Sequence, residues 1–134
     1  MGAFHFASDL ARELAINEAE MDYIHLKSYD GEKAGEVRVI YFPKPARTQG
    51  RRLVVIDDII DRGKTLLLIK KLLGSLPEKV IFVCLLDKKS KREVEMEADF
   101  IGFEIDDLFV YGYGLDLDES HRDMPDIYVK TKTD

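Results

Sequence analysis

The sequence has little of several features that would point to secretion, membrane insertion or a zinc site. Its one cysteine, Cys84, rules out an internal disulfide and is typical of a protein from a reducing compartment. No apolar run approaches the roughly 20 residues that cross a bilayer, and the amino terminus lacks a basic segment followed by an apolar stretch. The three histidines have no cysteine or histidine partner at ligand spacing. We therefore expect a soluble, cytoplasmic protein without a zinc site.

The chain also lacks an excess of positive charge, since its 20 basic residues are outnumbered by 26 acidic ones and the net charge is −6. This balance argues against broad nonspecific binding to nucleic acid, and we expect neither a nucleic-acid nor a membrane partner. The exception is a local basic cluster over residues 88–92 (KKSKR), which is either a solvated turn or partly functional through Lys88. The length of 134 residues, without a repeat or a linker, predicts one domain.

The apolar pattern predicts alternating strands and helices. Helical spacing indicates an opening helix from Phe4 to about Asn17 and a second helix whose buried stripe runs from Leu66 to Leu76. The predicted strands and shorter apolar pieces are residues 21–26, 37–42, 53–56, 80–86, 100–103, 108–111 and 127–129. Such alternation favours a mostly parallel sheet flanked by helices.

The most informative motif is residues 53–65 (LVVIDDIIDRGKT), where a buried strand gives way to a helix. In open α/β sheets, ligands bind at this end of a strand, because loop N–H groups and the start of the next helix attract an anion. Asp57, Asp58 and Asp61 would hold hydroxyls, a proton or Mg²⁺ beside that anion. The motif predicts a site for a phosphorylated sugar, although Asp57 and Asp58 alone would also suit an ordinary helix N-cap region.

Two other readings of the motif fit less well. An ATP-type P-loop needs a glycine five positions before Gly63, where Asp58 stands. Paired acids after a strand are also found in phosphoacceptor receiver domains, with Asp87 in the place of their acceptor aspartate. That reading leaves residues 61–65 and the tail segment 111–116 (YGYGLD) without a role.

Residues 57–65 resemble the phosphoribosyl pyrophosphate (PRPP) signature of type I phosphoribosyltransferases, with two acids, two apolar residues, an acid and a small phosphate loop. The tail is similar to that of hypoxanthine-guanine phosphoribosyltransferases in residues 100–105 (FIGFEI), 109–116 (FVYGYGLD) and 121–125 (HRDMP). Residues 85–88 match as well, and the resemblance extends from residue 2 to residue 127. It implies an α/β fold with a mostly parallel sheet, helices on its faces and a small C-terminal hood over about residues 100–134, all in one domain.

Enzymes of this family transfer ribose 5-phosphate from PRPP to a 6-oxopurine, hypoxanthine or guanine, and release pyrophosphate. This glycosyltransferase reaction serves purine salvage, and its demands on the protein are largely electrostatic. The resemblance implies that Asp61 is the acid/base group at N7 of the purine. It further implies that PRPP and its phosphate are held by Asp57, Asp58, Asp61, Arg62, Gly63, Lys64 and Thr65.

The resemblance also assigns residues to the purine. Lys88 would donate to O6, Phe109 would stack on the ring and the main chain of Val110 would read its edge, which selects 6-oxopurines over adenine. Taken alone, Phe109 would suit a core aromatic. Ser28 and Tyr29 would belong to a closing lid that excludes water.

For pyrophosphate, the resemblance implies Mg²⁺ as cofactor. Asp116 would ligate an ion on pyrophosphate, while Asp57 and Asp58 would hold the ribose hydroxyls directly or through Mg²⁺. Gly2 and Arg122 would contact the leaving pyrophosphate. Before the resemblance is considered, Asp116 suits simple solvated acidity equally well.

Two departures from the family pattern stand out. Family members have a further strand and a pyrophosphate loop before the first helix, and Met1-Gly2 falls on the end of that loop, so we expect this strand to be missing. Its loss would leave two strands with unpaired backbone groups, so either a homo-oligomer or an altered sheet is expected. Arg62 replaces a small hydroxyl residue and would either grip or obstruct the 5′-phosphate. These departures favour, as an alternative, a purine-nucleotide-binding sensor or partner subunit with weakened transfer.

Overall fold

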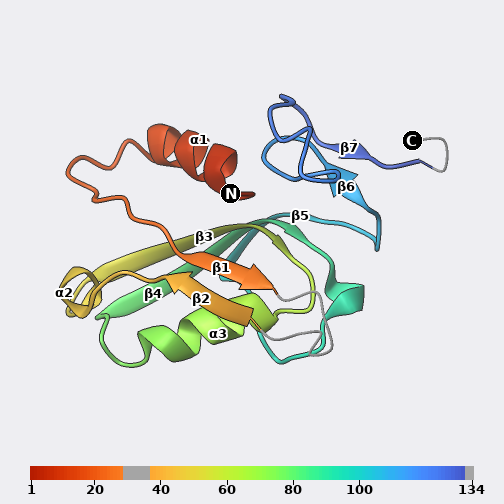
Figure 1. Cartoon of the computed structure of the whole chain (residues 1–134). Helices are drawn as coiled ribbons and strands as arrows, with labels where there is room; N and C mark the ends of the chain where they lie inside the picture. Colours follow the sequence, from red (N-terminus) through yellow and green to blue (C-terminus); the bar gives the residue numbers. More distant parts are fainter. Residues whose placement is uncertain (29–36, 132–134) are drawn as a thin grey trace.

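The computed structural model describes residues 1–28 and 37–131, which form an α/β fold with three small sheets (Figure 1). None of the helices in this part of the chain is long and apolar enough to cross a membrane.

The central sheet is parallel and has the strand order β3-β4-β5. Its strands are β3 (Arg52–Ile60), β4 (Lys79–Asp87) and β5 (Phe100–Glu104). The continuous apolar runs of β3 and β4 suit strands that are covered on both faces. The register pairs Ile60 with Asp87, so the carboxyl ends of β3 and β4 lie side by side at one edge of the sheet.

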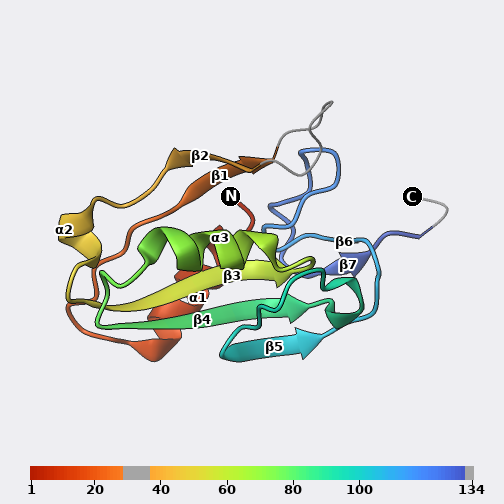
Figure 2. The same cartoon turned by 90° about the horizontal axis from the view of Figure 1, so that it is seen from below.

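Helices α1 (Phe4–Leu14) and α3 (Lys64–Leu73) lie on opposite faces of this sheet, as the two views in Figures 1 and 2 agree. Leu66, Ile69 and Leu73 recur at helical spacing on α3 and are buried in the hydrophobic core. By contrast, α1 has no buried residue. The prediction of a mostly parallel sheet flanked by helices is therefore confirmed.

A two-stranded antiparallel ribbon lies beside the central sheet. It consists of β1 (His25–Ser28) and β2 (Val37–Tyr41) and lies on the β3 side of the sheet (Figure 2). Ile24 and Leu26 pack against the hydrophobic core. Within the described residues, however, β1 pairs only with β2 and β3 pairs only with β4. The ribbon and the sheet are therefore separate sheets with a shared core.

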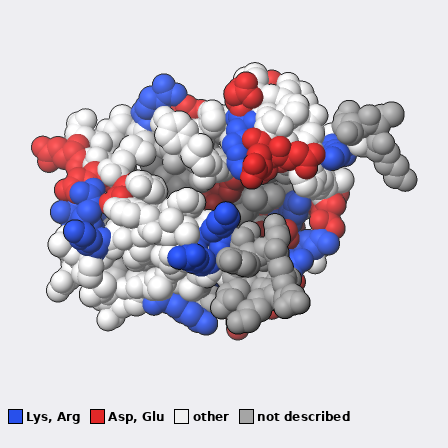
Figure 3. Space-filling view, viewed as in Figure 1, with Lys and Arg blue, Asp and Glu red and all other residues white. Residues whose placement is uncertain are grey.

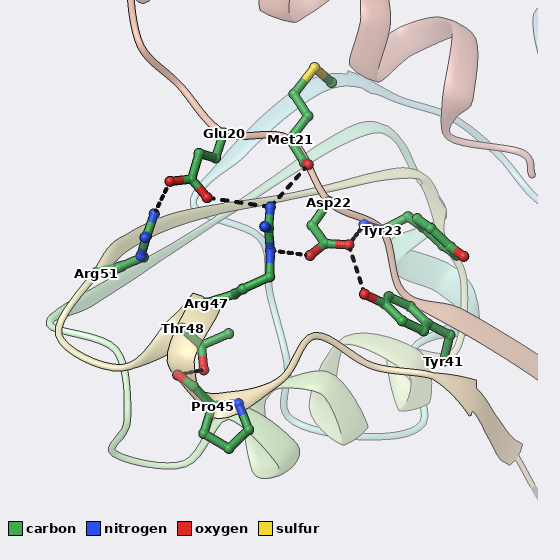
Figure 4. Close-up of polar contacts among 9 residues, drawn as sticks. All are labelled: Glu20, Met21, Asp22, Tyr23, Tyr41, Pro45, Arg47, Thr48 and Arg51. Atoms are coloured by element: carbon green, nitrogen blue, oxygen red, sulfur yellow. Dashed lines mark hydrogen bonds and ion pairs between the residues drawn. The ribbon is translucent and has the colours of Figure 1, made fainter.

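A polar network fixes the irregular segment before β1 to the short helix α2 (Pro45–Thr48) (Figure 4). Arg47 Nε lies 2.6 Å from Asp22 Oδ2, and Arg47 Nη2 lies 3.4 Å from Glu20 Oε2. Arg51 Nη1 adds a contact of 2.9 Å to Glu20 Oε1. These contacts explain why the segment leads into β1 along a defined path although it has no regular secondary structure.

The C-terminal segment folds back over the amino terminus. Its strands β6 (Val110–Tyr111) and β7 (Tyr128–Val129) pair in antiparallel fashion, and turns fill the chain between them. Acidic side chains gather on this segment in the space-filling view (Figure 3). The Tyr113 hydroxyl donates a hydrogen bond of 2.6 Å to Asp9 Oδ2 of α1. The C-terminal segment is thus tied to the first helix.

Element boundaries differ from the predictions where local contacts override the apolar pattern. The first helix ends at Leu14 instead of about residue 17, because Ala15 has a left-handed φ of 46°. The first strand begins at His25 instead of residue 21, since the preceding residues are held in the network around α2. Strand β3 continues to Ile60 and not residue 56, so the acidic pair lies inside the strand.

Candidate functional site

The phosphate loop connects β3 to α3 and contains a glycine that no other residue can replace without strain. Gly63 is the N-cap residue of α3 and has a left-handed φ of 81°. A Cβ at this position would lie 2.9 Å from Arg92 Cδ and 3.1 Å from Val94 Cγ2. The first N–H groups of α3, which begins at Lys64, have no partner within the helix and favour an anion. Thr65, in the same turn, is exposed.

The acidic pair lies near the end of β3, so the N-cap reading of Asp57 and Asp58 is wrong: the N-cap of α3 is Gly63. Burial, and next the negative charge of Asp58, raise the pKa of the Asp57 carboxyl well above its ordinary value. Asp58 faces the amino terminus, because a Cβ on Gly2 would lie 1.8 Å from Asp58 Oδ2. The structure therefore brings Gly2 to the acidic pair.

Two residues that were predicted to contact the purine follow adjacent strand ends, and one of them has a buried oxygen without a partner in the described residues. Lys88 directly follows β4, is 9% exposed, and its N–H donates to Ile60 O at 2.9 Å. Its ammonium has no hydrogen-bond or ion-pair partner among residues 1–28 and 37–131. Asp61 Oδ1 is buried and has no hydrogen bond within the described residues. Buried polar groups are normally paired, so the Asp61 oxygen, with Lys88 at the adjacent strand end, suits a polar ligand.

Phe109 is not the core aromatic that its sequence context alone would suit, because 54% of its surface is exposed. Lys130 Nζ lies 5.7 Å from its ring centroid, and the Lys130 N–H donates to Phe109 O at 2.8 Å. Val110, the next residue, pairs with Val129 in the β6–β7 ribbon. This ribbon holds the backbone of Val110 in extended form and leaves the aromatic ring accessible for stacking.

Arg122 and Asp116 meet beside the amino terminus. Arg122 Nη1 donates to Gly114 O at 2.7 Å, and Arg122 Nη2 lies 3.2 Å from Asp116 Oδ1. Gly114 has a φ of 98°, and a Cβ there would lie 2.1 Å from Gly2 O. Together with the contact between Gly2 and Asp58, this close approach gathers the residues predicted for pyrophosphate in one region.

Arg62 and Lys64 both turn toward the connection between β4 and β5. Lys64 Nζ lies 2.5 Å from Glu93 Oε2, and Arg62 Nε lies 3.3 Å from Glu93 Oε1. The side chain of Arg62 is 62% exposed. Ser28 ends β1, whereas Tyr29, its predicted partner in a lid, lies outside the described residues.

The described residues contain no group of three or more His, Cys, Asp or Glu side chains placed to hold a metal ion. Asp57 and Asp58 form a pair of neighbouring carboxylates, and Asp116 is paired with Arg122. Mg²⁺ is commonly held by one or two carboxylates together with substrate phosphates. These donors therefore fit Mg²⁺ only if a phosphorylated substrate supplies the remaining ligands.

Sequence reasoning missed Arg92, which it treated only as part of the basic cluster. Arg92 Nη2 lies 2.5 Å from Asp87 Oδ1, and the Asp87 side chain is fully buried. A signal was available: Asp87 ends an apolar run, and a buried carboxylate needs a cationic or hydrogen-bonding partner. The sequence does not say which of the following basic residues is that partner.

An α/β sheet with a phosphate loop and an acidic pair at its strand ends is typical of a phosphoribosyltransferase. In agreement, the model of the phosphoribosyl transferase domain family matches residues 1–118. The chain belongs to this family. The hypoxanthine-guanine phosphoribosyltransferase of Bacillus subtilis is 40% identical over 131 residues, which are 96% of this chain and 72% of that protein. The hypoxanthine phosphoribosyltransferase of Salmonella typhimurium is 37% identical over 127 residues, or 92% of this chain and 70% of that protein.

Solved structures lead to the same group of proteins. The hypoxanthine phosphoribosyltransferase of Trypanosoma cruzi, in complex with its product IMP, superposes with a TM-score of 0.88 at 32% identity. The match covers 99% of this chain and 72% of that one. A hypoxanthine-guanine phosphoribosyltransferase of Bacillus anthracis superposes with a TM-score of 0.86 at 34% identity. This match covers 98% of this chain and 78% of that one.

Proposed function

We propose that this protein is a purine phosphoribosyltransferase that transfers ribose 5-phosphate from PRPP to hypoxanthine or guanine and releases pyrophosphate. The observation that carries this proposal is the buried Asp61 Oδ1, which has no hydrogen bond within the described residues, together with the largely buried Lys88. They lie at the ends of adjacent strands, beside a helix N-terminus suited to a phosphate. The similarity to hypoxanthine and hypoxanthine-guanine phosphoribosyltransferases supports the same reaction.

In this reaction, the bond between C1′ and the pyrophosphate oxygen breaks, and its electron pair leaves with pyrophosphate. The purine N9 forms the new bond to C1′, and Asp61 accepts the proton that the base gives up at N7. The loop backbone and the hydroxyl of Thr65 hold the 5′-phosphate. Lys88 donates to O6 of the purine, which favours 6-oxopurines over adenine. Phe109 stacks on the ring, and the main chain of Val110 contacts its edge.

On the donor side, Asp57 and Asp58 hold the ribose hydroxyls, and Arg122 contacts pyrophosphate with Gly2 nearby. When bound to the substrate phosphates, Mg²⁺ would reduce the negative charge on the leaving group. Asp116 is the residue we assign to this ion. Segment 100–134 serves as a hood over the site within one domain of residues 1–134, and Ser28 and Tyr29 belong to a lid.

The cytoplasmic location and the homo-oligomeric state stay predictions. The first rests on the single cysteine, Cys84, and the second on the unpaired edge of β3 within the described residues.

The test is turnover with PRPP, Mg²⁺ and, in separate reactions, hypoxanthine, guanine, xanthine or adenine. We expect nucleotide formation with hypoxanthine or guanine and none with adenine. Asp61→Asn should lower kcat by about 10²- to 10⁴-fold, because it removes the proton acceptor without changing the size of the side chain. Asp118→Asn, which neutralises an exposed acid, is the matched control. Binding of inosine monophosphate without turnover would instead identify a nucleotide-binding sensor or partner subunit.

A further inference from the structure

The connection between β4 and β5, residues 88–99, packs against the end of β3 and the phosphate loop. Three successive carbonyl oxygens, those of Ile60, Asp61 and Arg62, each accept a hydrogen bond from it. The Lys88 N–H donates to Ile60 O at 2.9 Å, and the Glu93 N–H donates to Arg62 O at 3.1 Å. The carbonyl between these two, that of Asp61, accepts its hydrogen bond from a side chain.

That side chain is Arg92. Its Nη1 donates to Asp61 O at 2.5 Å, and its Nη2 donates to Asp87 Oδ1 at 2.5 Å. The Asp87 side chain is 0% exposed and that of Arg92 is 15% exposed, so this ion pair is shielded from water. The stem of Arg92 also packs against Gly63, where a Cβ would lie 2.9 Å from Arg92 Cδ. One side chain thus spans from the end of β4 to the start of α3.

We propose that Arg92 is a positioning residue that fixes the phosphate loop relative to the purine site. This inference rests on the proposed function. By holding the Asp61 carbonyl, Arg92 fixes the orientation of the Asp61 carboxylate and of the loop N–H groups behind it. By holding Asp87, it joins this loop to the residue that directly precedes Lys88. The groups that hold the base and the groups that hold the 5′-phosphate therefore keep a constant separation.

The chemistry of arginine suits this role. Its planar guanidinium carries donors on separate nitrogens, so it can bind two acceptors at once in a fixed geometry, whereas a lysine ammonium is a point charge on a flexible stem. Because transfer requires N9 of the base to meet C1′ of the donor at close range, a displacement of about 1 Å costs on the order of 100-fold in rate. A rigid link between the two halves of the site has a direct effect on this distance.

A purely structural role must be separated from positioning, because Arg92 is also the counter-ion of a fully buried carboxylate. Removing one partner of a buried ion pair leaves an uncompensated charge, which destabilises the fold. Replacing Asp87 by the isosteric, neutral Asn in the same chain removes that charge. The pair of changes Arg92→Met and Asp87→Asn should therefore restore stability, but it leaves the Asp61 carbonyl without its guanidinium donor.

The experiment compares Arg92→Met, Arg92→Lys and the double variant with the unchanged protein. Lys91→Met is the matched control, because Lys91 is an exposed neighbour whose ammonium pairs with Asp107. Four quantities are measured: Tm, the Kd of inosine monophosphate by calorimetry, and the KM for PRPP and kcat with hypoxanthine.

We expect Arg92→Met to lower Tm and to raise both the Kd of inosine monophosphate and the KM for PRPP by about tenfold or more. In the double variant, Tm should recover while the Kd and KM stay high. Arg92→Lys should keep most of the Tm and still fail to restore Kd and KM. The control should match the unchanged protein in every quantity.

The proposal is overturned if binding and turnover recover together with Tm in the double variant, since Arg92 would then be only a counter-ion. Full activity of Arg92→Lys would overturn it as well. If Arg92→Met does not fold, the Lys variant and the double variant still decide between the two roles. Failure of the unchanged protein both to bind inosine monophosphate and to turn over would refute the proposed function instead.

Discussion

At the scale of single residues, the two carboxylates of the acidic pair in β3 repel each other, and they are also the groups that we assign to substrate binding. Asp57 and Asp58 are adjacent and partly buried, so a second negative charge at this point is unfavourable. A sugar hydroxyl or a cation on the substrate would relieve this repulsion. Enzymes commonly keep such unfavourable groups where they serve ligand binding, and they tolerate the loss of stability.

We predict that Asp57→Asn is more stable than the unchanged protein at pH 7 but binds PRPP more weakly. The folded-state pKa of Asp57 is raised, so its ionisation destabilises the fold above the ordinary pKa of 3.8, and this penalty grows as the pH rises through the raised value. The neutral Asn has no such penalty, and Tm should rise by about 2–8 °C. The gain should disappear toward pH 4. The KM for PRPP should rise about tenfold, because charge-assisted hydrogen bonds are lost.

The measurement is a set of Tm values between pH 4 and pH 8 with Asp118→Asn, an exposed acid in the C-terminal segment, as the control. A variant that is less stable than the unchanged protein at pH 7 would mean that the ionised Asp57 stabilises the fold.

The residues of the site differ in how far the sequence reveals them. Asp57, Asp61 and Gly63 stand in one contiguous motif, so their neighbourhood follows from the order of the chain. The link from Arg92 to the Asp61 carbonyl joins residues 31 positions apart and leaves no local pattern. Its existence depends on the register of β3 against β4, which the apolar pattern alone does not fix.

At the scale of elements, the strands and helices with strong apolar periodicity were predictable. The runs at residues 53–56 and 80–86 indicated buried strands, and these strands are β3 and β4. The start of β1 was predicted wrongly because Asp22 binds Arg47 of α2, a contact that depends on tertiary structure. The same holds for the tie between the C-terminal segment and α1, which no local pattern indicates.

The hydrogen bond from Tyr113 to Asp9 predicts that the stability of the contact between the C-terminal segment and α1 depends on pH. Burial, and next the hydrogen bond to Asp9, raise the pKa of Tyr113 to about 12 from its ordinary value of 10.0. A raised tyrosine pKa means that the folded state keeps the proton more firmly than the unfolded state. The stability that the tie contributes is therefore present below pH 10 and is lost as the pH rises toward about 12.

Tyr113→Phe should consequently lower the midpoint of urea unfolding at pH 8, and its difference from the unchanged protein should shrink between pH 10 and about 12. Tyr23→Phe serves as the control, because Tyr23 is 65% exposed and stacks on Tyr41. The two differences are compared at each pH. A constant difference for Tyr113→Phe would show that its hydroxyl does not donate to an ionised Asp9.

At the scale of the whole molecule, the arrangement of the sheets is the feature with the largest consequence. Within the described residues, β3 pairs with β4 on one side, and no strand pairs with it on the other. The β1–β2 ribbon shares the hydrophobic core with the sheet through Ile24 and Leu26, but it does not close the sheet. Backbone groups along such an edge pair with water or with another chain.

Hydrogen exchange should reveal this edge. We expect alternate amides of β3 (Arg52–Ile60) to exchange like those of an edge strand, and the amides of β4 (Lys79–Asp87), which has a partner on each side, to be protected far longer. The comparison of β3 with β4 is internal to one sample, so it needs no second variant. Uniform protection along β3 at the lowest protein concentration would mean that another segment of the same chain pairs with it.

The concentration dependence of that exchange then decides the assembly. An intermolecular partner binds by mass action, so protection of β3 should rise with protein concentration if copies of the chain fill the edge, while protection of β4 stays constant. The predicted homo-oligomer requires this rise, together with a mass above 15.4 kDa in light scattering over the same range. A mass of one chain at all concentrations, with β3 amides in fast exchange, would contradict the homo-oligomer and leave β3 as a solvated edge strand.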